Sequence, residues 1–184
     1  SSVAMLQDLW DLLENAKKHV RCIVGGPHAT IDPSVFAGLA DVIVTGEAET
    51  VIAQAISNPN ISGVIQAQNV IENLDDLPTA AFDVFAPLPY NWNSGWKSNN
   101  KSSPEWLVGQ RVWNLNTSRG CPSGCKFCTV PDVWGRSYRA QSAKRIIDDM
   151  LRLKLDFKAD GIYFREDNFT HDQNRVFTFC ENLI

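Results

Sequence analysis

"RCIVGGPHAT", residues 21–30, sets a short apolar run directly against a pair of glycines. Residues 22–24 form the run, and Gly25 and Gly26 end it. A continuous apolar run is typical of a strand that is buried on both faces. Glycines after such a run indicate a turn or a close approach of the backbone. The stretch therefore predicts a parallel strand of an α/β sheet.

The flanking sequence extends this pattern in both directions. Before it, apolar residues recur at helical spacing over residues 6–18, which predicts an amphipathic helix. After it, "DVIVTGEAET" (residues 41–50) predicts a second buried strand that ends at Gly46, with Glu47 and Glu49 where a helix could begin. Helices and strands that alternate in this way are typical of a doubly wound sheet. We expect about two strands of that sheet in this sequence and the others upstream.

Residues 57–110 have a different composition, rich in Asn, Ser, Pro and Trp, and predict a linker with capping segments. Within them, "NLDDLPTAAFDVF" (residues 73–85) predicts an extended connector that packs through Leu77, Phe82 and Phe85. The aromatic and Asn-rich residues 90–106 could stack on nucleic-acid bases, but the net charge of −4 favours a surface loop.

From residue 111 the α/β pattern returns. "RVWNLNTS" (residues 111–118) and "GIYF" (161–164) predict two strands, separated by a helix that Ser142 caps, and Asp172 caps a last helix. This order is typical of the start of a (β/α) barrel or of a second parallel sheet, and in a barrel functional residues gather at the carboxyl ends of the strands. The side chains predicted to face the core are Ile146, Ile147, Met150 and Leu151 in the first helix, and Val176, Phe179, Cys180 and Leu183 in the last.

The composition indicates which partners and which cellular compartment to expect. The chain is 44% hydrophobic and has no basic face to bind a polyanion, so we expect a small-molecule substrate and no nucleic acid. It has no apolar run long enough to span a membrane and no secretory signal, which predicts a cytoplasmic protein with reduced thiols. Both ends look cut, because no initiator Met is present and the sequence stops within a helical pattern. We therefore expect a piece of a longer protein.

Three of the five cysteines lie close together in "RGCPSGCKFC", residues 119–128. An odd number of thiols in a reducing compartment favours metal or redox chemistry over disulfides. A structural zinc needs four ligands, and the nearest further candidates, His171 and Cys180, lack paired spacing. A [4Fe–4S] cluster held by three thiolates keeps one iron open to a substrate or cofactor. The spacing favours the cluster, and a zinc-binding module is the alternative.

The stretch "TSRGCPSGCKFC" (residues 117–128) resembles the CxxxCxxC signature of radical S-adenosylmethionine enzymes, including the aromatic residue before the third cysteine. "GGPHAT" (residues 25–30), "TGEAET" (45–50), the 73–85 connector and "YFREDNFTHD" (163–172) are similar to the subgroup in which a cobalamin-binding domain precedes the radical domain. The resemblance covers most of the chain.

The resemblance implies three groups of cofactor-binding residues, for a [4Fe–4S] cluster, S-adenosylmethionine and cobalamin. The cluster ligands would be Cys121, Cys125 and Cys128; Phe127 and Glu166 or Asp167 would contact S-adenosylmethionine, and Gly25, Gly26 and Ser2 would lie near the cobalamin tail. A carboxylate suits the methionine ammonium group because it accepts charge-assisted hydrogen bonds. The alternatives are a helix-entry acidic pair at residues 166–167 and an ordinary turn at the glycines. At Ser2 the family's second hydroxyl is replaced by Ala4.

The resemblance also implies the domain order and the reaction. Residues 1–56 would be the C-terminal part of a doubly wound, Rossmann-like cobalamin-binding domain, 57–110 a linker, and 111–184 the first β/α units of a radical partial TIM barrel. The expected enzyme cleaves S-adenosylmethionine reductively and methylates an unactivated carbon, with a flavodoxin or ferredoxin as electron donor. The alternatives are a cobalamin-dependent radical cyclase or oxidoreductase of tetrapyrrole or lipid biosynthesis, and a truncated chain without activity.

Overall fold

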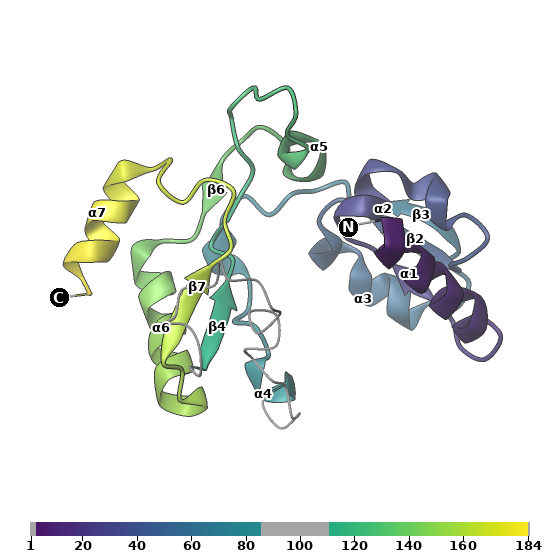
Figure 1. Cartoon of the computed structure of the whole chain (residues 1–184), viewed down its shortest axis with the longest axis horizontal. Helices are drawn as coiled ribbons and strands as arrows, with labels where there is room; N and C mark the ends of the chain where they lie inside the picture. The colour runs from purple at the N-terminus through teal and green to yellow at the C-terminus, as the bar shows by residue number, and fades with distance from the viewer. Residues whose placement is uncertain (1–2, 86–110, 184) are drawn as a thin grey trace. The chain divides into compact units, whose positions relative to one another are not determined.

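The computed structural model describes residues 3–85 and 111–183, which form two compact units. The first unit takes its residues from Ser1–Glu72 and Gly120–Ser137, and the second takes its residues from Asn73–Arg119 and Tyr138–Ile184. Figure 1 shows the chain, coloured from purple at the N-terminus to yellow at the C-terminus. The domain boundaries expected after residues 56 and 110 stay predictions.

A parallel sheet forms the centre of the first unit. Its strands are β1 (Ile23–Val24), β2 (Val42–Thr45) and β3 (Gly63–Gln66), in the order β1-β2-β3. The two predicted parallel strands are confirmed, and β2 is buried along its whole length as its apolar sequence predicts. The expectation of only two strands was wrong. β3 is a mostly exposed edge strand, and its mixed composition gives little strand signal.

Helices cover both faces of this sheet. On one face, α1 (Val3–Ala16), α2 (Pro27–Ile31) and the 3₁₀ turn η1 (Pro33–Phe36) pack over Ile43. On the other face, η2 (Ala48–Thr50) and α3 (Ile52–Ser57) pack over Val42 and Val44. Successive strand residues point to opposite faces, so a continuous apolar run supplies both cores. The two buried clusters are Leu13, Cys22, Ala29, Phe36, Ala40 and Ile43, and Val42, Val44 and Ala55.

The second unit is built around a parallel strand–helix–strand arrangement. Strands β4 (Val112–Leu115) and β7 (Gly161–Phe164) pair in parallel, and helix α6 (Ala143–Phe157) lies beside them (Figure 1). Ser142 caps α6 by accepting a hydrogen bond from the Arg145 N–H, and Asp172 caps α7 (Gln173–Glu181) in the same way. Both strands and both caps are confirmed. One such unit is compatible with the start of a (β/α) barrel, and the barrel itself stays a prediction.

The buried stripes of α6 and α7 differ in part from the prediction. In α6, Ile146 and Leu153 are fully buried, whereas Leu151 is exposed. In α7, Phe179 is buried as predicted, but Cys180 is exposed. The other buried residue of this helix is Arg175, four positions before Phe179. The stripe of α7 therefore includes a charged residue, which hydrophobic periodicity alone does not identify. The exposed Leu183 was also predicted to be buried.

The connector is anchored to the start of α6. It contains the 3₁₀ turn η3 (Leu74–Asp76), and the Asp75 carboxylate accepts a hydrogen bond of 2.9 Å from the Ser142 N–H. The Arg145 guanidinium donates to the carbonyl oxygens of Asp75 and Leu77, at 3.0 and 2.9 Å. These hydrogen bonds satisfy connector carbonyls that no strand pairs.

The last part of the connector packs through an aromatic cluster. Helix α4 (Phe82–Phe85) places Phe82 edge-on to Trp113, with ring centroids 5.2 Å apart. Trp113 in turn lies 5.2 Å from the Phe157 ring. The predicted packing of Phe82 is confirmed and Leu77 is half-buried. The Phe85 side chain and the aromatic stretch 90–106 lie outside the described residues.

No helix within residues 3–85 and 111–183 is both long and apolar enough to cross a membrane.

Candidate cofactor-binding site

Two short strands close the base of the cysteine loop. β5 (Ser118–Arg119) leads into residues 120–138 and β6 (Arg139–Ala140) leads out, and the two strands pair antiparallel. Beside this pair, the Gln141 N–H donates a hydrogen bond of 2.8 Å to the Thr117 carbonyl oxygen. We call residues 117–119 and 139–141 the neck of the cysteine loop.

The first residue after β5 is a glycine that the loop requires. Gly120 has φ +82°, and a Cβ at this position would lie 2.1 Å from the Ser137 carbonyl oxygen. No side chain fits at that distance, so the two ends of the loop meet here through backbone alone. This explains the glycine that directly precedes Cys121.

All three loop cysteines lie at or near the surface, and none of them forms a disulfide. Cys125 is exposed, and Cys121 and Cys128 are half-buried. The Cys128 N–H donates to the Cys125 carbonyl oxygen at 3.1 Å, and α5 (Val130–Trp134) follows this turn directly. Within the first unit, α5 lies beside α2, which starts just after Gly26.

The thiols suit an iron–sulfur cluster in type and number, because thiolates are its protein ligands and none of the three is tied up in a disulfide. Over the described ranges, however, no three His, Cys, Asp or Glu side chains already surround a common point. The described ranges therefore contain no ready-made site for a single metal ion. His171, one of the two further zinc ligands considered from the sequence, lies in a tilted ring contact with Tyr138, with ring centroids 4.6 Å apart.

The two acidic residues after β7 have different surroundings. Glu166 has a side chain only 1% exposed and accepts hydrogen bonds from the Thr117 N–H at 2.7 Å and from the hydroxyls of Thr117 and Ser118. Asp167 is exposed. Partial burial, and to a lesser extent the neighbouring Glu166 carboxylate, raise the pKa of Asp167 above its ordinary value. Of the two carboxylates predicted to contact S-adenosylmethionine, Asp167 is the accessible one.

A buried arginine completes the surroundings of Glu166. The Arg175 side chain is 6% exposed, and its guanidinium lies 4.0 Å from the Glu166 carboxylate. The sequence analysis missed this residue, because a charged residue on a helix is usually assigned to the solvent face. The available signal was its spacing, four residues before Phe179 on the buried side of α7.

The other residues predicted to bind cofactors lie at the surface. Phe127 is 89% exposed, so its ring is free of the core. Gly26 has φ +101° with open space where a side chain would be, so its backbone favours glycine. A Cβ on Gly25 would make an ordinary contact of 3.5 Å with the Val44 carbonyl oxygen, so neither φ nor packing requires glycine there. Ser2 lies outside the described residues.

The glycine pair lies at the carboxyl edge of the first unit's sheet. Gly25 follows β1, and Gly46 with the buried Glu47 follows β2. The Thr30 hydroxyl accepts a hydrogen bond of 3.0 Å from the Gly46 N–H, which ties α2 to this edge. Open α/β sheets bind ligands outside the carboxyl ends of their strands. Gly25 and Gly26 therefore lie at the edge where sheets of this kind bind ligands.

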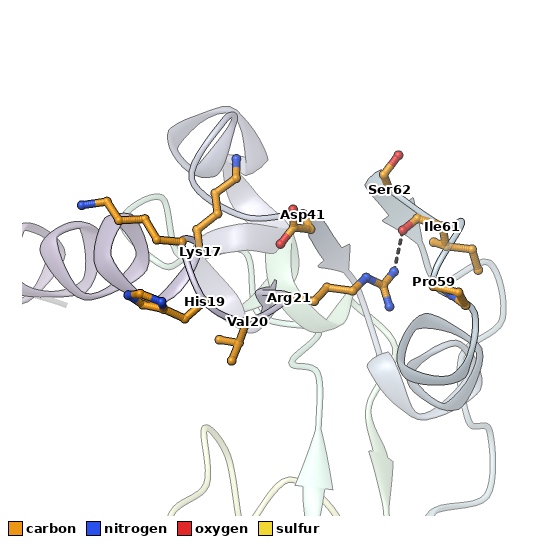
Figure 2. A pocket seen from close by; sticks show the side chains of 9 residues that line it. Lys17, His19, Val20, Arg21, Asp41, Pro59, Ile61 and Ser62 are labelled. Carbon is orange, nitrogen blue, oxygen red and sulfur yellow. Dashed lines mark hydrogen bonds between the residues drawn. The ribbon is translucent and has the colours of Figure 1, made fainter.

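A basic pocket lies at the opposite edge of the same sheet (Figure 2). Arg21 precedes β1 there and donates to the carbonyl oxygens of Ala55 and Ile61, at 2.6 and 2.5 Å. Lys17 donates to the Gly38 carbonyl oxygen at 2.6 Å. Both side chains thus hold together backbone segments at this edge of the sheet. Its lining residues are Lys17, Lys18, His19, Val20, Arg21, Asp41, Pro59, Ile61 and Ser62.

Comparison with known proteins finds methyltransferases and a cyclase, while no protein-family model matches the chain. An uncharacterised methyltransferase of Pyrococcus horikoshii is 27% identical over 90% of this chain and 37% of its own length. The anaerobic magnesium-protoporphyrin IX monomethyl ester cyclase of Cereibacter sphaeroides is 27% identical over 88% of this chain and 28% of its own. The cytidylyl-2-hydroxyethylphosphonate methyltransferase of Streptomyces wedmorensis is 35% identical over 56% of this chain and 18% of its own.

The chain is thus a homologue of proteins named as methyltransferases and of one named as a cyclase. Together with the CxxxCxxC motif that ends at Cys128, these similarities are consistent with a piece of a protein of the radical S-adenosylmethionine superfamily. The chain spans about a third or less of the length of the relatives described above.

Proposed function

We propose that the chain is part of a radical S-adenosylmethionine methyltransferase that uses a [4Fe–4S] cluster and cobalamin to methylate an unactivated carbon. The observation that carries the proposal is the loop of three cysteines, at CxxxCxxC spacing and outside any disulfide, after the first strand of a parallel strand–helix–strand unit. The carboxyl end of such a strand is where (β/α) barrels place functional residues. Several relatives named as methyltransferases or methylases support the type of reaction.

The loop and the end of β7 supply the proposed binding groups. Cys121, Cys125 and Cys128 would hold the cluster, which supplies the electron for reductive cleavage of S-adenosylmethionine. Asp167 is exposed and would accept hydrogen bonds from the methionine ammonium group. The exposed ring of Phe127 would lie against the adenine and exclude water from it.

Cobalamin would bind at the carboxyl edge of the first unit's sheet. Gly25 carries no side chain although neither its backbone angles nor its packing requires glycine, so the ligand's approach explains the residue best. Gly26 permits the turn into α2. Ser2 stays a prediction for the nucleotide tail. Cobalamin would carry the methyl group, and the protein's part is to hold it and exclude competing reactions.

The proposal also includes a small-molecule substrate and a cytoplasmic location. The electron donor would be a flavodoxin or a ferredoxin. The cyclase relative favours one second candidate, a radical cyclisation that uses the same cofactors. The two reactions differ in their products. Methyl transfer forms S-adenosylhomocysteine and a methylated product, whereas cyclisation forms neither.

The experiment that tests the proposal uses the chain after anaerobic reconstitution with iron and sulfide. We expect close to four irons per chain, as a [4Fe–4S] cluster holds, and loss of most of this iron in Cys121→Ser, Cys125→Ser and Cys128→Ser. Cys180→Ser is the matched control, because this thiol is exposed but lies outside the motif. A chain that binds about one zinc and no iron under these conditions would overturn the proposal in favour of a zinc module.

A further inference from the structure

Glu166 and Arg175 lie together at the neck of the cysteine loop, from two elements that are distant from it in sequence. Glu166 follows β7, and Arg175 lies in the first turn of α7. Both side chains are buried. Neither contains an atom that the proposed chemistry uses, so their burial needs another explanation.

We propose that Glu166 and Arg175 are positioning residues that clamp the neck of the cysteine loop and so keep in place the two ends of the segment that carries the proposed cluster ligands. The role toward the cluster rests on the function proposed above. The clamp itself is made of contacts among described residues of the second unit, so it can be tested even in the absence of metal.

Glu166 holds the strand that enters the loop. Its Oε1 atom accepts hydrogen bonds from the backbone N–H and the hydroxyl of Thr117, and its Oε2 atom accepts one from the Ser118 hydroxyl. Thr117 is itself almost fully buried. Both carboxylate oxygens are therefore engaged, directly before the residues that lead to Cys121.

Arg175 joins the strand that enters the loop to the strand that leaves it. On the entering side it donates to the Thr117 hydroxyl and, at 3.4 Å, to the Thr117 carbonyl oxygen. On the leaving side it donates to the Tyr138 hydroxyl and the Gln141 carbonyl oxygen, each at 2.9 Å. A planar guanidinium with several fixed donors suits this role, which a lysine could fill only in part.

The Thr117 hydroxyl connects the two charged residues. It accepts a hydrogen bond from Arg175 and donates one to Glu166. The guanidinium also lies over the Phe169 ring, 5.1 Å from its centroid. A buried ion is costly unless its hydrogen-bonding groups are satisfied, and here most of them are satisfied by the neck. Glu166 and Arg175 thus bind the neck more than each other, and their carboxylate and guanidinium are linked mainly through Thr117.

Clamping matters because the pairing at the neck is short. β5 and β6 contribute two residues each, too few to fix a long loop without further contacts. A free neck would add the entropy cost of closing the loop to the cost of gathering three thiolates at one cluster. With the neck held, the entropy cost of ordering on binding is confined to the loop itself.

The test compares Glu166→Gln, Arg175→Lys and the milder Ser118→Ala, which removes one hydrogen bond to Glu166. The matched control is Ile146→Val, which loosens the core of the same unit without touching the neck. Each folded variant is reconstituted with iron and sulfide, and iron per chain is measured beside the thermal midpoint. We expect at least a threefold loss of iron in Glu166→Gln and Arg175→Lys, a smaller loss in Ser118→Ala, and none in Ile146→Val. If Ile146→Val lost as much iron as the Glu166 and Arg175 variants at a similar thermal midpoint, the iron loss would reflect lower stability of the whole unit. That result would overturn the proposal.

Amide hydrogen exchange of the metal-free chain separates this proposal from the proposed function. In Glu166→Gln, Arg175→Lys and Ser118→Ala we expect at least tenfold faster exchange at residues 118–119 and 139–141, with unchanged exchange in β4. If the wild-type chain binds no iron, the proposed function fails while these rates still test the clamp. Unchanged exchange at the neck in Ser118→Ala and in the folded Glu166→Gln chain would overturn the clamp, whatever the iron content.

Discussion

Glu166 and Asp167 are adjacent in sequence, yet their carboxylates have opposite surroundings. Glu166 is buried and accepts three hydrogen bonds from Thr117 and Ser118, whereas Asp167 is exposed. A sequence reading treats the two as alternatives for one role. The structure gives them different surroundings: Glu166 is hydrogen-bonded at the neck of the cysteine loop, and Asp167 is exposed to solvent.

Replacing Asp167 should weaken the binding of S-adenosylmethionine to the reconstituted chain. The variant Asp167→Asn removes a charge-assisted hydrogen bond, whose loss costs about 1.5–3 kcal/mol, or roughly 10- to 150-fold in affinity. Equilibrium dialysis with labelled S-adenosylmethionine measures the change, and iron per chain should stay at the wild-type level. Wild-type affinity in Asp167→Asn would remove this residue from the site.

The raised pKa of Asp167 predicts a pH dependence of stability. Its cause is partial burial and then the Glu166 carboxylate, both of which disfavour the charged form in the folded chain. The folded chain therefore holds this proton more tightly than the unfolded chain, and the resulting stabilisation is complete below the ordinary pKa near 4 and is lost as the pH rises through the raised value. Urea unfolding from pH 3.5 to 7 should show wild type losing stability relative to Asp167→Asn. The difference should be small, because the side chain is exposed, and an opposite sign would contradict the assigned cause.

The two glycines after β1 should respond differently to alanine. Gly26→Ala forces a side chain into a positive φ and should destabilise the first unit by about 1–3 kcal/mol. Gly25→Ala makes only an ordinary contact with Val44 and should leave the free energy of unfolding nearly unchanged. Urea unfolding measures both.

Cobalamin binding then distinguishes a ligand-binding glycine from a structural one. If the backbone at Gly25 approaches cobalamin, Gly25→Ala should lower cobalamin affinity at unchanged stability, as measured by the absorbance of the retained cofactor after gel filtration. Full retention of cobalamin by Gly25→Ala would argue that the pair is an ordinary turn.

The anchor between the connector and α6 should contribute measurably to the stability of the second unit. Arg145→Met keeps much of the side-chain volume but removes the hydrogen bonds to Asp75 and Leu77 and leaves the buried Asp149 without its partner 3.0 Å away. We expect a loss of about 2–4 kcal/mol. Lys144→Met serves as the control, because the Lys144 pair is exposed and should change stability by under about 1 kcal/mol. Equal effects of the two changes would contradict the anchor.

The sequence predicts the regular elements because their signals are local. The apolar runs at residues 22–24 and 42–44 appear as parallel strands, and Ser142 and Asp172 appear as helix caps. Edge strand β3 escaped prediction, since one partner strand and a largely exposed surface leave no distinctive pattern.

The candidate site also has one part that local sequence patterns predict and one part that they do not. Cysteine spacing is a local property and identifies the loop, but the different surroundings of Glu166 and Asp167 depend on contacts with Thr117, which is 49 residues from Glu166. Arg175 was missed for the same reason, because its neck partner Thr117 lies 58 residues away. Contacts of such separation are fixed by the parallel pairing of β4 with β7, which single-residue patterns do not encode.

The most direct test of the central claim is an electron paramagnetic resonance spectrum of the anaerobically reconstituted, dithionite-reduced chain, recorded with and without S-adenosylmethionine. If three cysteines leave one iron open, a [4Fe–4S]⁺ signal will appear and shift when S-adenosylmethionine is added, and Cys125→Ser will abolish it. A chain that gives no iron–sulfur signal and retains zinc in its place would contradict the account.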